Sequence, residues 1–396
     1  MSGASRPRIV YVVTSDTTAD VLLRGRLSHL SRSGFDVQVI CGAGDRVEAV
    51  SAREGVACHA ISLEREFSAG RDARASLALV RLLRRLRPDI VNASTPKAAL
   101  LGLCAAGLAG VPHRVYLLRG LRLETLSPVA RTGMALVERL CSRLAHEVLC
   151  VSESLRATYV AQGLAPTDKC RVLGSGSSNG IDTERFTRSP DLERRAAELA
   201  AGLGLDTGAP TLGFVGRPVR DKGIADLASV FQRVRSVYPA AQLLIVGAGF
   251  GGDAECTEMA ELRRSSGVFV VPSVENVAPY YCLMNVLVFS SYREGFPNVV
   301  LEGSCAGLPV VGFDVTGVKD AIVHGQTGQI CPLGDARALG EAALTYLRDP
   351  ALAHRHGQAG TLRAQREFAR ERIWAELTTF YRGLLRSPGS PGPGAT

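Results

Sequence analysis

Two glutamates, Glu294 and Glu302, lie in the segment of the sequence that is best suited to chemistry. This segment follows an apolar run that ends at Phe289, and its glycine and proline favour an open loop up to Asn298, a good helix-capping residue. Glu302 is then expected about one turn inside a helix, roughly 6 Å along its axis from Asn298. Two carboxylates with the N–H groups of a helix N-terminus between them suit a ligand with hydroxyls at both ends and an anion in the middle, such as a sugar nucleotide. Taken alone, the segment could equally be two surface glutamates beside a helix start.

Two cations elsewhere in the second half favour the sugar nucleotide. Arg217 and Lys222 follow the apolar run that ends at Val215, where paired cations can neutralise the charge on a departing diphosphate without a metal ion. The sequence has no acidic cluster of the DxD type, and His354 and His356 have no partners at metal-ligand spacing. We therefore predict that the site uses no metal ion and no cofactor.

Three polar segments in the first half, 14–18, 94–97 and 119–125, could form an acceptor site, because each follows an apolar run. Lys97 and Arg119 are predicted to bind a phosphate. Asp16 or Glu124 is predicted to polarise a hydroxyl group. Each segment alone is typical of an ordinary polar loop, so the prediction depends on their meeting at one edge of a sheet.

A competing pattern is the GxGxxG motif from Gly247 to Gly252, with Glu275 about twenty residues further on. The motif could make the second half a dinucleotide binder and the protein an NAD-dependent oxidoreductase. It is weak by itself, and it follows the second apolar run of its half, whereas the dinucleotide motif normally follows the first. The oxidoreductase is therefore kept as an alternative without other support.

Ten short apolar runs must position these residues. Continuous apolar runs separated by helical segments are typical of parallel strands covered on both faces. The predicted fold class is α/β, with two doubly wound, Rossmann-like domains that face a central cleft, because such sheets bind ligands at the carboxyl ends of their strands. The runs are 9–13, 37–40, 90–92, 114–118 and 147–151 in the first half, and 211–215, 241–246, 268–271, 286–289 and 309–312 in the second.

The predicted domain boundary is the run of small residues from Gly174 to Gly180, which suits a hinge. We predict an acceptor-binding N-terminal domain over 1–180 and a nucleotide-sugar-binding C-terminal domain over 181–365. A closing helix over 366–386 should pack back toward the N-terminal domain. The Pro-, Gly- and Ser-rich residues 387–396 should form a disordered tail.

Composition excludes several classes of protein. The 396 residues are 46% hydrophobic and 21% charged, which excludes a disordered chain and suggests two domains. No uncharged apolar run reaches the roughly 18 residues of a membrane-spanning helix, and the first residues carry no export signal. The ten cysteines show no CxxC or zinc-ligand spacing. We therefore expect a cytoplasmic protein that is at most peripheral to the inner face of the plasma membrane.

The positive charge is confined to the first half of the chain. Residues 1–180 contain 24 Lys and Arg against 15 Asp and Glu, whereas the remainder contains 22 against 23. The first half should therefore face an anionic partner, such as a phosphorylated ligand or an acidic lipid surface. Nucleic acid is not expected, because the basic residues are mostly arginines of helical faces without interleaved aromatic side chains.

Together these residues resemble glycosyltransferase family 4, which comprises retaining enzymes with the GT-B fold. The family's signature of two glutamates separated by seven residues is similar to the segment from Glu294 to Glu302. Segments 94–98, 119–121 and 174–176 resemble the branch that acts on capsular, exopolysaccharide or O-antigen intermediates carried on polyprenyl diphosphate. The resemblance covers nearly the whole chain, and its other motifs are Gly216-Arg217 with Lys222, Asn179-Gly180-Ile181-Asp182, Phe186, Gly307-Leu308-Pro309-Val310-Val311, Gly325-Gln326-Thr327-Gly328 and Gly334-Asp335.

The resemblance implies a role for each matching residue. Glu302 would bind the ribose hydroxyls, Glu294 would bind the donor sugar, and Arg217 and Lys222 would hold the diphosphate. Transfer would retain the anomeric configuration, with the leaving phosphate helping to deprotonate the attacking hydroxyl. The other donor-binding residues would be Gly216, then Gly295, Phe296, Pro297 and Asn298 around the sugar and the α-phosphate, and Asn276 and Val277 near the base.

Three positions depart from the family pattern. Arg119 stands where many members carry a histidine near the reacting centre, and residues 15–18 replace glycines that approach the diphosphate. Both changes bear on the acceptor side and leave the donor site intact. Asn285 replaces the usual aspartate of a Met-Asp pair, a structural change that we expect to be mild.

The expected activity is the transfer of a hexose, an N-acetylhexosamine or a uronic acid from a UDP-sugar to a lipid-phosphate or glycolipid acceptor in cell-envelope polysaccharide synthesis. An anionic membrane surface is the other expected partner. One alternative keeps the chemistry but uses a secondary-metabolite acceptor, such as the precursor of a phosphoglycolipid antibiotic. Another is a catalytically silent nucleotide-sugar-binding protein, against which the intact donor residues argue.

Overall fold

The computed structural model describes residues 6–63, 68–249 and 256–386. It divides the chain into unit 1, Met1–Asn179 with Glu371–Thr396, and unit 2, Gly180–Arg370. This division falls one residue before the predicted boundary at Gly180. The predicted disordered tail, 387–396, and the end of the GxGxxG motif lie outside the described residues.

Unit 1 contains a seven-stranded parallel sheet in the order β3-β2-β1-β4-β5-β6-β7. The five strands expected from the apolar runs are confirmed. Strands β3 and β7 were not predicted, because each is a short edge strand whose residues are partly exposed and form no apolar run. The strands are β1 (Arg8–Val12), β2 (Asp36–Cys41), β3 (Ala57–Ala60), β4 (Ile90–Ser94), β5 (His113–Leu118), β6 (Glu147–Cys150) and β7 (Cys170–Val172).

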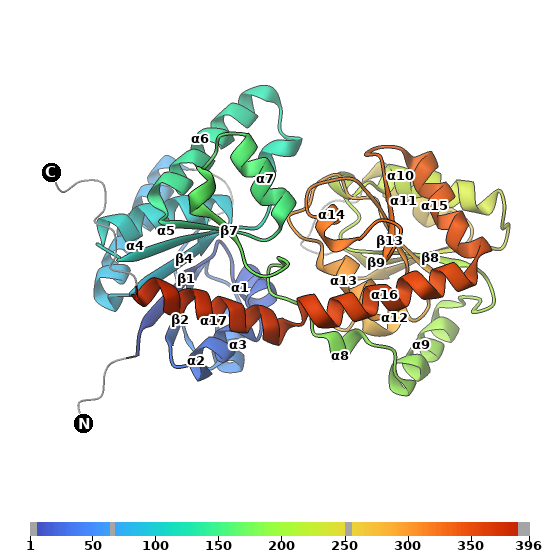
Figure 1. Cartoon of the computed structure of the whole chain (residues 1–396), viewed down its shortest axis with the longest axis horizontal. Helices are drawn as coiled ribbons and strands as arrows, with labels where there is room; N and C mark the ends of the chain where they lie inside the picture. Colours follow the sequence, from blue (N-terminus) through green and yellow to red (C-terminus); the bar gives the residue numbers. More distant parts are fainter. Residues whose placement is uncertain (1–5, 64–67, 250–255, 387–396) are drawn as a thin grey trace. The chain divides into compact units, whose positions relative to one another are not determined.

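The helices of unit 1 cover this sheet, and α4, α5 and α6 pack beside one another in that order (Figure 1). The unit contains α1 (Asp16–Leu22), α2 (Arg26–Arg32), α3 (Val47–Glu54), α4 (Ala69–Leu86), α5 (Pro96–Leu108), η1 (Arg122–Thr125), α6 (Pro128–Leu144), α7 (Glu153–Ala161), η2 (Thr167–Lys169) and α17 (Arg370–Arg386). No helix in the described part of the chain is both long enough and apolar enough to cross a membrane.

The C-terminal helix α17 packs on the N-terminal sheet. The hydroxyl of Tyr381 lies 2.9 Å from that of Tyr11 on β1 and accepts a hydrogen bond of 2.8 Å from the Asn92 amide on β4. Trp374 donates to the Asn179 side chain at 2.9 Å. The sequence prediction began this helix at residue 366, whereas the structure begins it at Arg370 because the preceding helix runs to Phe368.

Unit 2 contains a six-stranded parallel sheet in the order β10-β9-β8-β11-β12-β13. Both sheets reverse their strand order, between β1 and β4 in unit 1 and between β8 and β11 in unit 2, so both are doubly wound, as predicted. Of the strands described in this unit, β13 alone was not predicted from the sequence. The strands are β8 (Thr211–Val215), β9 (Gln242–Ala248), β10 (Val268–Pro272), β11 (Val286–Phe289), β12 (Val310–Phe313) and β13 (Gly328–Cys331).

The helices of unit 2 start and stop at residues that the sequence marks. For example, Ser189 caps α9 by accepting from the N–H of Leu192 at 3.3 Å, Pro190 occupies its first position, and Gly204 ends it in the left-handed region. The helices are α8 (Thr183–Phe186), α9 (Pro190–Leu203), η3 (Arg220–Lys222), α10 (Ile224–Arg235), α11 (Thr257–Arg264), α12 (Ala278–Tyr281), α13 (Asn298–Cys305), α14 (Val318–Ala321), α15 (Ala336–Arg348) and α16 (Pro350–Phe368).

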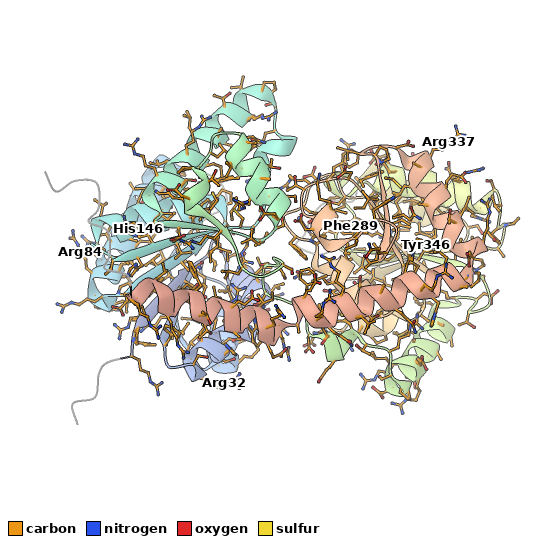
Figure 2. All side chains as sticks on the ribbon, in the orientation of Figure 1. Arg32, Arg84, His146, Phe289, Arg337 and Tyr346 are labelled. Carbon is orange, nitrogen blue, oxygen red and sulfur yellow. The ribbon has the colours of Figure 1, made fainter. Side chains whose placement is uncertain are left out.

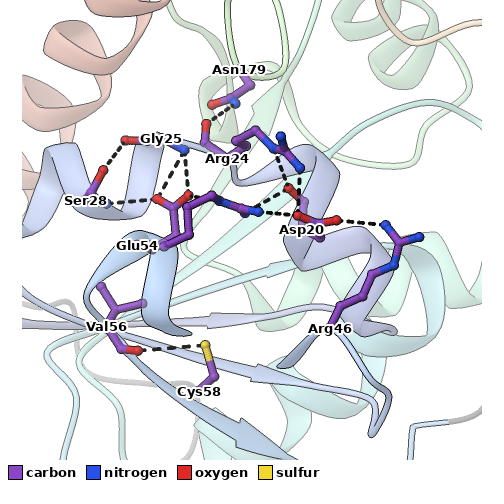
Figure 3. Close-up of polar contacts among 10 residues, drawn as sticks. Asp20, Arg24, Gly25, Ser28, Arg46, Glu54, Val56, Cys58 and Asn179 are labelled. Atoms are coloured by element: carbon purple, nitrogen blue, oxygen red, sulfur yellow. Dashed lines mark hydrogen bonds and ion pairs between the residues drawn. The ribbon is translucent and has the colours of Figure 1, made fainter. Parts of the chain in front are cut away.

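An ion-pair cluster around Asp20 joins α1 to α3 in unit 1 (Figure 3). The Asp20 carboxylate pairs with Arg24 at 3.0 Å, with Arg46 at 2.8 Å and with Arg53. Burial by itself raises the pKa of Asp20, but hydrogen bonds from Arg53, Arg46 and Arg24 outweigh it and hold the pKa below its usual value. The cluster therefore stabilises the fold only while Asp20 is ionised.

Asp20→Asn is expected to lower the Tm at neutral pH and to flatten its dependence on pH. Because folding lowers the pKa of Asp20, its stabilising contribution is complete above the unfolded pKa of about 3.9 and is lost as the pH falls through the lower, folded pKa. Thermal unfolding from pH 7 down to acid pH measures this. Asp314→Asn, which breaks an exposed pair with Lys319, is the control. Equal acid slopes for wild type and Asp20→Asn would contradict the prediction.

Candidate active site

A cavity of about 180 Å³ lies at the switch point of the unit 2 sheet, beyond the carboxyl ends of β8 and β11. This is the position at which open α/β sheets bind ligands. Phe289, labelled in Figure 2, ends β11 and forms part of the wall. The lining residues are Phe214, Val215, Gly216, Lys222, Phe289, Ser291, Glu294, Phe296, Pro297, Asn298 and Val299. Six of the eleven site residues predicted in this unit, Gly216, Lys222, Glu294, Phe296, Pro297 and Asn298, are therefore brought together.

An ion pair between Lys222 and Glu294 lies in this cavity, and both side chains are mostly shielded from solvent. Two buried serines that follow β11 hold the turn that carries Lys222. Ser290 Oγ donates to the carbonyl of Lys222 at 2.9 Å, and Ser291 Oγ donates to the carbonyl of Asp221 at 3.4 Å. The cation and the carboxylate are thus positioned by the same strand end before any ligand binds.

Gly223 follows Lys222 and lets its turn approach β11 closely. Its φ is +68°, in the left-handed region, and a Cβ at this position would lie 2.0 Å from the carbonyl oxygen of Ser290. No other residue type can occupy this position without moving the backbone.

Gly223→Ala is expected to lower the free energy of unfolding by about 2 to 4 kcal/mol, because the clash with Ser290 adds to the strain of the left-handed conformation. Gly204→Ala is the matched control, since Gly204 has a φ of +69° and its Cβ would meet no atom within 4 Å. That variant should lose only about 1 to 2 kcal/mol. Denaturant unfolding measures both, and equal losses would argue against the close approach.

The start of α13 corrects one sequence prediction. We expected Asn298 to cap the helix, but Pro297 occupies the N-cap position and α13 begins with Asn298 itself. Pro297 has an extended conformation, with φ −84° and ψ 99°, which suits the residue before the first helical turn. The side-chain oxygen of Asn298 is shielded from solvent and belongs to the cavity wall, and no described residue hydrogen-bonds to it, so it can accept a hydrogen bond from a ligand.

Glu302 lies on α13, outside the residues that line the cavity. Its Oε2 accepts a hydrogen bond of 2.7 Å from the hydroxyl of Tyr281 on α12. Burial raises the pKa of Glu302, and the Tyr281 hydrogen bond and the charge of Arg185 partly offset this shift. Among the described residues, no donor is paired with the other oxygen of this carboxylate, and such a group suits the recognition of a sugar diol.

Arg185 links the surroundings of Glu302 to the segment predicted to approach the base. Its Nη2 donates to the carbonyl of Glu275 at 2.8 Å and to the side-chain oxygen of Asn276 at 3.2 Å. The sequence analysis assigned no role to Arg185 or to Tyr281. These two residues can be recognised only from tertiary contacts, because α8 and α12 are short helices separated from Glu302 in the sequence.

Besides Glu302, four other predicted donor residues lie outside the residues that line the cavity, namely Arg217, Gly295, Asn276 and Val277. Gly216 has a φ of +137°, and a Cβ there would meet no atom within 4 Å, so open space adjoins the backbone. Arg217 is exposed, Gly295 is buried in the loop before α13, and Val277 is the N-cap residue of α12. Within the described ranges, no three His, Cys, Asp or Glu side chains are grouped to hold a metal ion. The independence from metal stays a prediction.

Two of the four predicted acceptor residues, Asp16 and Lys97, already have polar partners within unit 1. Asp16 accepts from the N–H of Thr17 at 2.6 Å and of Arg46 at 3.1 Å. Lys97 is only 4% exposed and pairs with Asp72 at 2.6 Å, so a phosphate could reach its ammonium only by replacing that carboxylate. Glu124 lies in η1, and its side chain is outside the described part of the structure. Their roles in acceptor binding stay predictions.

Arg119, the fourth residue, forms a buried pair of cations with Arg26. Nε and Nη2 of Arg119 are shielded from solvent and have no hydrogen-bond partner in the described part of the chain, while Nη1 donates to Ser178. Burial lowers the pKa of Arg119 to about 9, and the charge of Arg26 contributes to the shift. Arg26 donates to Asn179 at 3.0 Å and to the carbonyl of Ser178. Among the described residues, neither guanidinium group has a carboxylate partner, an arrangement that favours binding of an anion.

Two family profiles match the chain. Glycosyltransferase Family 4 matches residues 19–185, and Glycosyl transferases group 1 matches residues 209–349. The capsular polysaccharide biosynthesis glycosyltransferase CapM of Staphylococcus aureus is 32% identical over 381 residues, which cover 96% of this chain and 98% of CapM. The alpha-maltose-1-phosphate synthase of Mycobacterium tuberculosis is 30% identical over 317 residues, which cover 74% of this chain and 78% of that protein.

Solved structures share the fold of the whole chain. Anabaena Alr3699/HepE in complex with UDP and glucose superposes with a TM-score of 0.78 at 19% identity, covering 95% of this chain and 100% of that chain. Sucrose-phosphate synthase from Thermosynechococcus elongatus gives a TM-score of 0.79 at 21% identity, with coverages of 96% and 99%. The predicted α/β architecture is thereby confirmed as GT-B, and the match to CapM along almost the full length of both sequences shows that this chain belongs to glycosyltransferase family 4.

Proposed function

We propose that the protein transfers a hexose, an N-acetylhexosamine or a uronic acid from a UDP-sugar to a lipid-phosphate-linked acceptor in cell-envelope polysaccharide synthesis, with retention at the anomeric carbon. The similarity to CapM, a capsular polysaccharide biosynthesis glycosyltransferase, supports a role in polysaccharide synthesis. The UDP and glucose bound to HepE support a UDP-sugar as the donor. The observation that carries the proposal is the ion pair of Lys222 and Glu294 in the cavity at the β8 and β11 strand ends.

We propose that donor binding moves the Lys222 ammonium from Glu294 to the diphosphate of the donor. A diphosphate carries more negative charge than one carboxylate, so it should draw the Lys222 ammonium away from Glu294. Glu294 then accepts hydrogen bonds from hydroxyls of the donor sugar. As the bond between the sugar and UDP breaks, Lys222 and Arg217 stabilise the charge on UDP. The acceptor oxygen bonds to the anomeric carbon on the same face, and its proton passes to the leaving phosphate.

The nucleoside half of the donor is proposed to lie along α13. Its ribose hydroxyls donate to Glu302, whose carboxylate is oriented by Tyr281 at 2.7 Å. The base approaches Asn276 and Val277, where Arg185 holds the Asn276 side chain at 3.2 Å. Burial deprives the Glu302 carboxylate of hydrogen bonds from water, and the ribose hydroxyls supply hydrogen bonds in their place. This contact should therefore contribute to the affinity for every uridine nucleotide.

The acceptor phosphate is proposed to complete the buried cation pair of Arg26 and Arg119 in unit 1. Two nitrogens of Arg119 have no hydrogen-bond partner among the residues that the structure describes, and its pKa of about 9 leaves the group charged at neutral pH. A phosphate or diphosphate has enough acceptor oxygens to serve both guanidinium groups. A phosphoglycolipid antibiotic precursor carries the same group, and the similarity to CapM favours the polysaccharide acceptor.

The donor proposal is tested by isothermal calorimetry with UDP, GDP, dTDP, their common sugars and NAD, in the presence of EDTA. UDP and one UDP-sugar are expected to bind. Glu302→Gln should weaken UDP binding by about tenfold or more, because it removes a charge that accepts hydrogen bonds from the ribose. Glu341→Gln, which alters an exposed glutamate of unit 2, should leave the affinity unchanged. Binding of NAD alone would overturn the proposal.

The acceptor is tested with a synthetic polyprenyl-phosphate-linked sugar. Arg119→Gln is expected to raise the KM for this acceptor by about tenfold or more, while the Kd of UDP stays unchanged. Arg119→Lys keeps a charge and should recover part of the loss. An unchanged acceptor KM in Arg119→Gln would move the acceptor phosphate away from this pair.

A further inference from the structure

Three large apolar side chains are exposed along one face of α6 in unit 1. Val129 is 86% exposed, Leu136 is 60% exposed and Leu140 is 44% exposed. Their spacings of seven and four residues place them in one row of an α-helix. A single exposed leucine is ordinary, whereas a row of three on one helix marks a surface that is covered in the working protein. We call these three residues the α6 apolar row.

The opposite side of α6 is anchored by polar contacts that determine which face points outward. Glu138 is completely buried and accepts hydrogen bonds from the hydroxyls of Tyr116 at 2.9 Å and Tyr159 at 3.0 Å. Ser142, one turn further on, lies 2.6 Å from the Tyr159 hydroxyl. Rotating α6 to bury its apolar row would break these contacts and expose a carboxylate that β5 and α7 now hold.

The charges on the exposed side of α6 are all positive. Arg139 and Arg143 are exposed next to Leu140 on this side, whereas Arg131 lies on the same side of the helix as Glu138, the only acidic residue of α6. An apolar row flanked by arginines complements an anionic lipid surface, whose acyl region takes the apolar side chains while its headgroups take the guanidinium groups. A symmetric dimer through this face would bring the same arginines of both copies together, which like-charge repulsion disfavours.

We propose that the α6 apolar row, with Arg139 and Arg143, docks the protein on an anionic membrane surface. The choice of a lipid surface rests on the proposed function, because a lipid-linked acceptor lies in such a surface. The fold agrees with this placement. Since α6 follows β5 and η1, its N-terminal end lies at the same edge of the unit 1 sheet as Arg119, which directly follows β5. Docking therefore brings the edge that carries Arg119 toward the headgroups.

The test is co-sedimentation of the full chain with vesicles of phosphatidylcholine alone and with about 30% phosphatidylglycerol. Wild type should bind the anionic vesicles, more weakly as salt rises. The triple variant Val129→Ser/Leu136→Ser/Leu140→Ser should bind at least about tenfold more weakly. Arg139→Gln/Arg143→Gln should lose about fivefold per arginine on anionic vesicles. Circular dichroism and Tm verify that each variant is folded.

Matched controls come from unit 2. Leu362, 67% exposed on α16, and Arg337, exposed on α15, offer Leu362→Ser and Arg337→Gln, both of which should bind as wild type does. No binding of wild type to anionic vesicles, or equal binding of the triple variant, overturns the inference. So does a dimer in sedimentation equilibrium that the triple variant abolishes, because that result assigns the face to a second copy.

The outcome is separable from that of the proposed function. Hydrolysis of the UDP-sugar in detergent-free buffer needs no lipid, so the triple variant should keep the wild-type rate. A protein that binds vesicles through α6 but binds no nucleotide refutes the proposed function and supports the docking face. A protein that binds UDP-sugar but ignores vesicles supports the donor proposal and refutes the docking face.

Discussion

Glu294→Gln is expected to lower kcat by about 100- to 1,000-fold while the Kd for UDP changes by less than about threefold. The substitution preserves the size of the side chain and removes the charge that pairs with Lys222 in the cavity. Contacts to the transferred sugar count mainly in the transition state, whereas UDP alone makes none of them. Steady-state kinetics with the UDP-sugar identified by calorimetry, and calorimetry with UDP, measure the two quantities.

The control for Glu294 is Glu341, whose exposed carboxylate pairs with Arg233 at 2.5 Å in the same unit. Glu341→Gln should leave both kcat and Kd within about twofold, because exposed ion pairs contribute little. Unchanged turnover in Glu294→Gln would separate this carboxylate from the donor sugar. A large loss of UDP affinity would instead place Glu294 at the nucleotide.

Lys222→Ala is expected to reduce both turnover and the affinity for UDP. The lysine is proposed to hold the diphosphate in the ground state and to stabilise its growing charge in the transition state, so kcat/KM should fall by about 1,000-fold and the Kd for UDP should rise by about tenfold or more. Uridine has no phosphate, so its affinity should not fall. Calorimetry with UDP and with uridine makes this comparison directly.

Two further variants make the Lys222 result specific. Lys222→Arg keeps the charge and should recover part of the UDP affinity, although guanidinium geometry differs from that of an ammonium. Lys319→Ala removes a half-exposed lysine that pairs with Asp314 at 3.0 Å and should change nothing. A normal UDP affinity in Lys222→Ala would place the diphosphate elsewhere.

The central strands could be predicted from the sequence because parallel strands in the middle of a sheet are buried on both faces. Val286 to Phe289, for example, are fully buried and appear in the sequence as a continuous apolar run. The strands that escaped prediction lie at sheet edges. Their residues face partly outward, so no apolar run marks them, as in Ala57–Ala60.

The candidate donor site was readable for a related reason. Gly216 directly follows β8, and Lys222 and Glu294 lie in the loops that follow β8 and β11. Parallel strands of one sheet end at a common edge, so the order of these residues along the chain predicts that they meet. Arg185 and Tyr281 were assigned no role, because their contacts with Asn276 and Glu302 join short helices that no local pattern aligns.

The acceptor residues predicted in unit 1 illustrate what the sequence alone could not predict. Lys97 and Arg119 have the same local signal, a cation after an apolar run. Yet Lys97 has Asp72 as its counter-ion, whereas Arg119 lies beside Arg26 and has no carboxylate partner within the described ranges. Residue type and spacing alone determined the two α/β domains and the positions of the candidate carboxylates Glu294 and Glu302, because these follow from local hydrophobic patterns and strand ends. Only the tertiary structure decided which charges are neutralised and which face of α6 stays uncovered, because those depend on side chains brought together from distant parts of the chain.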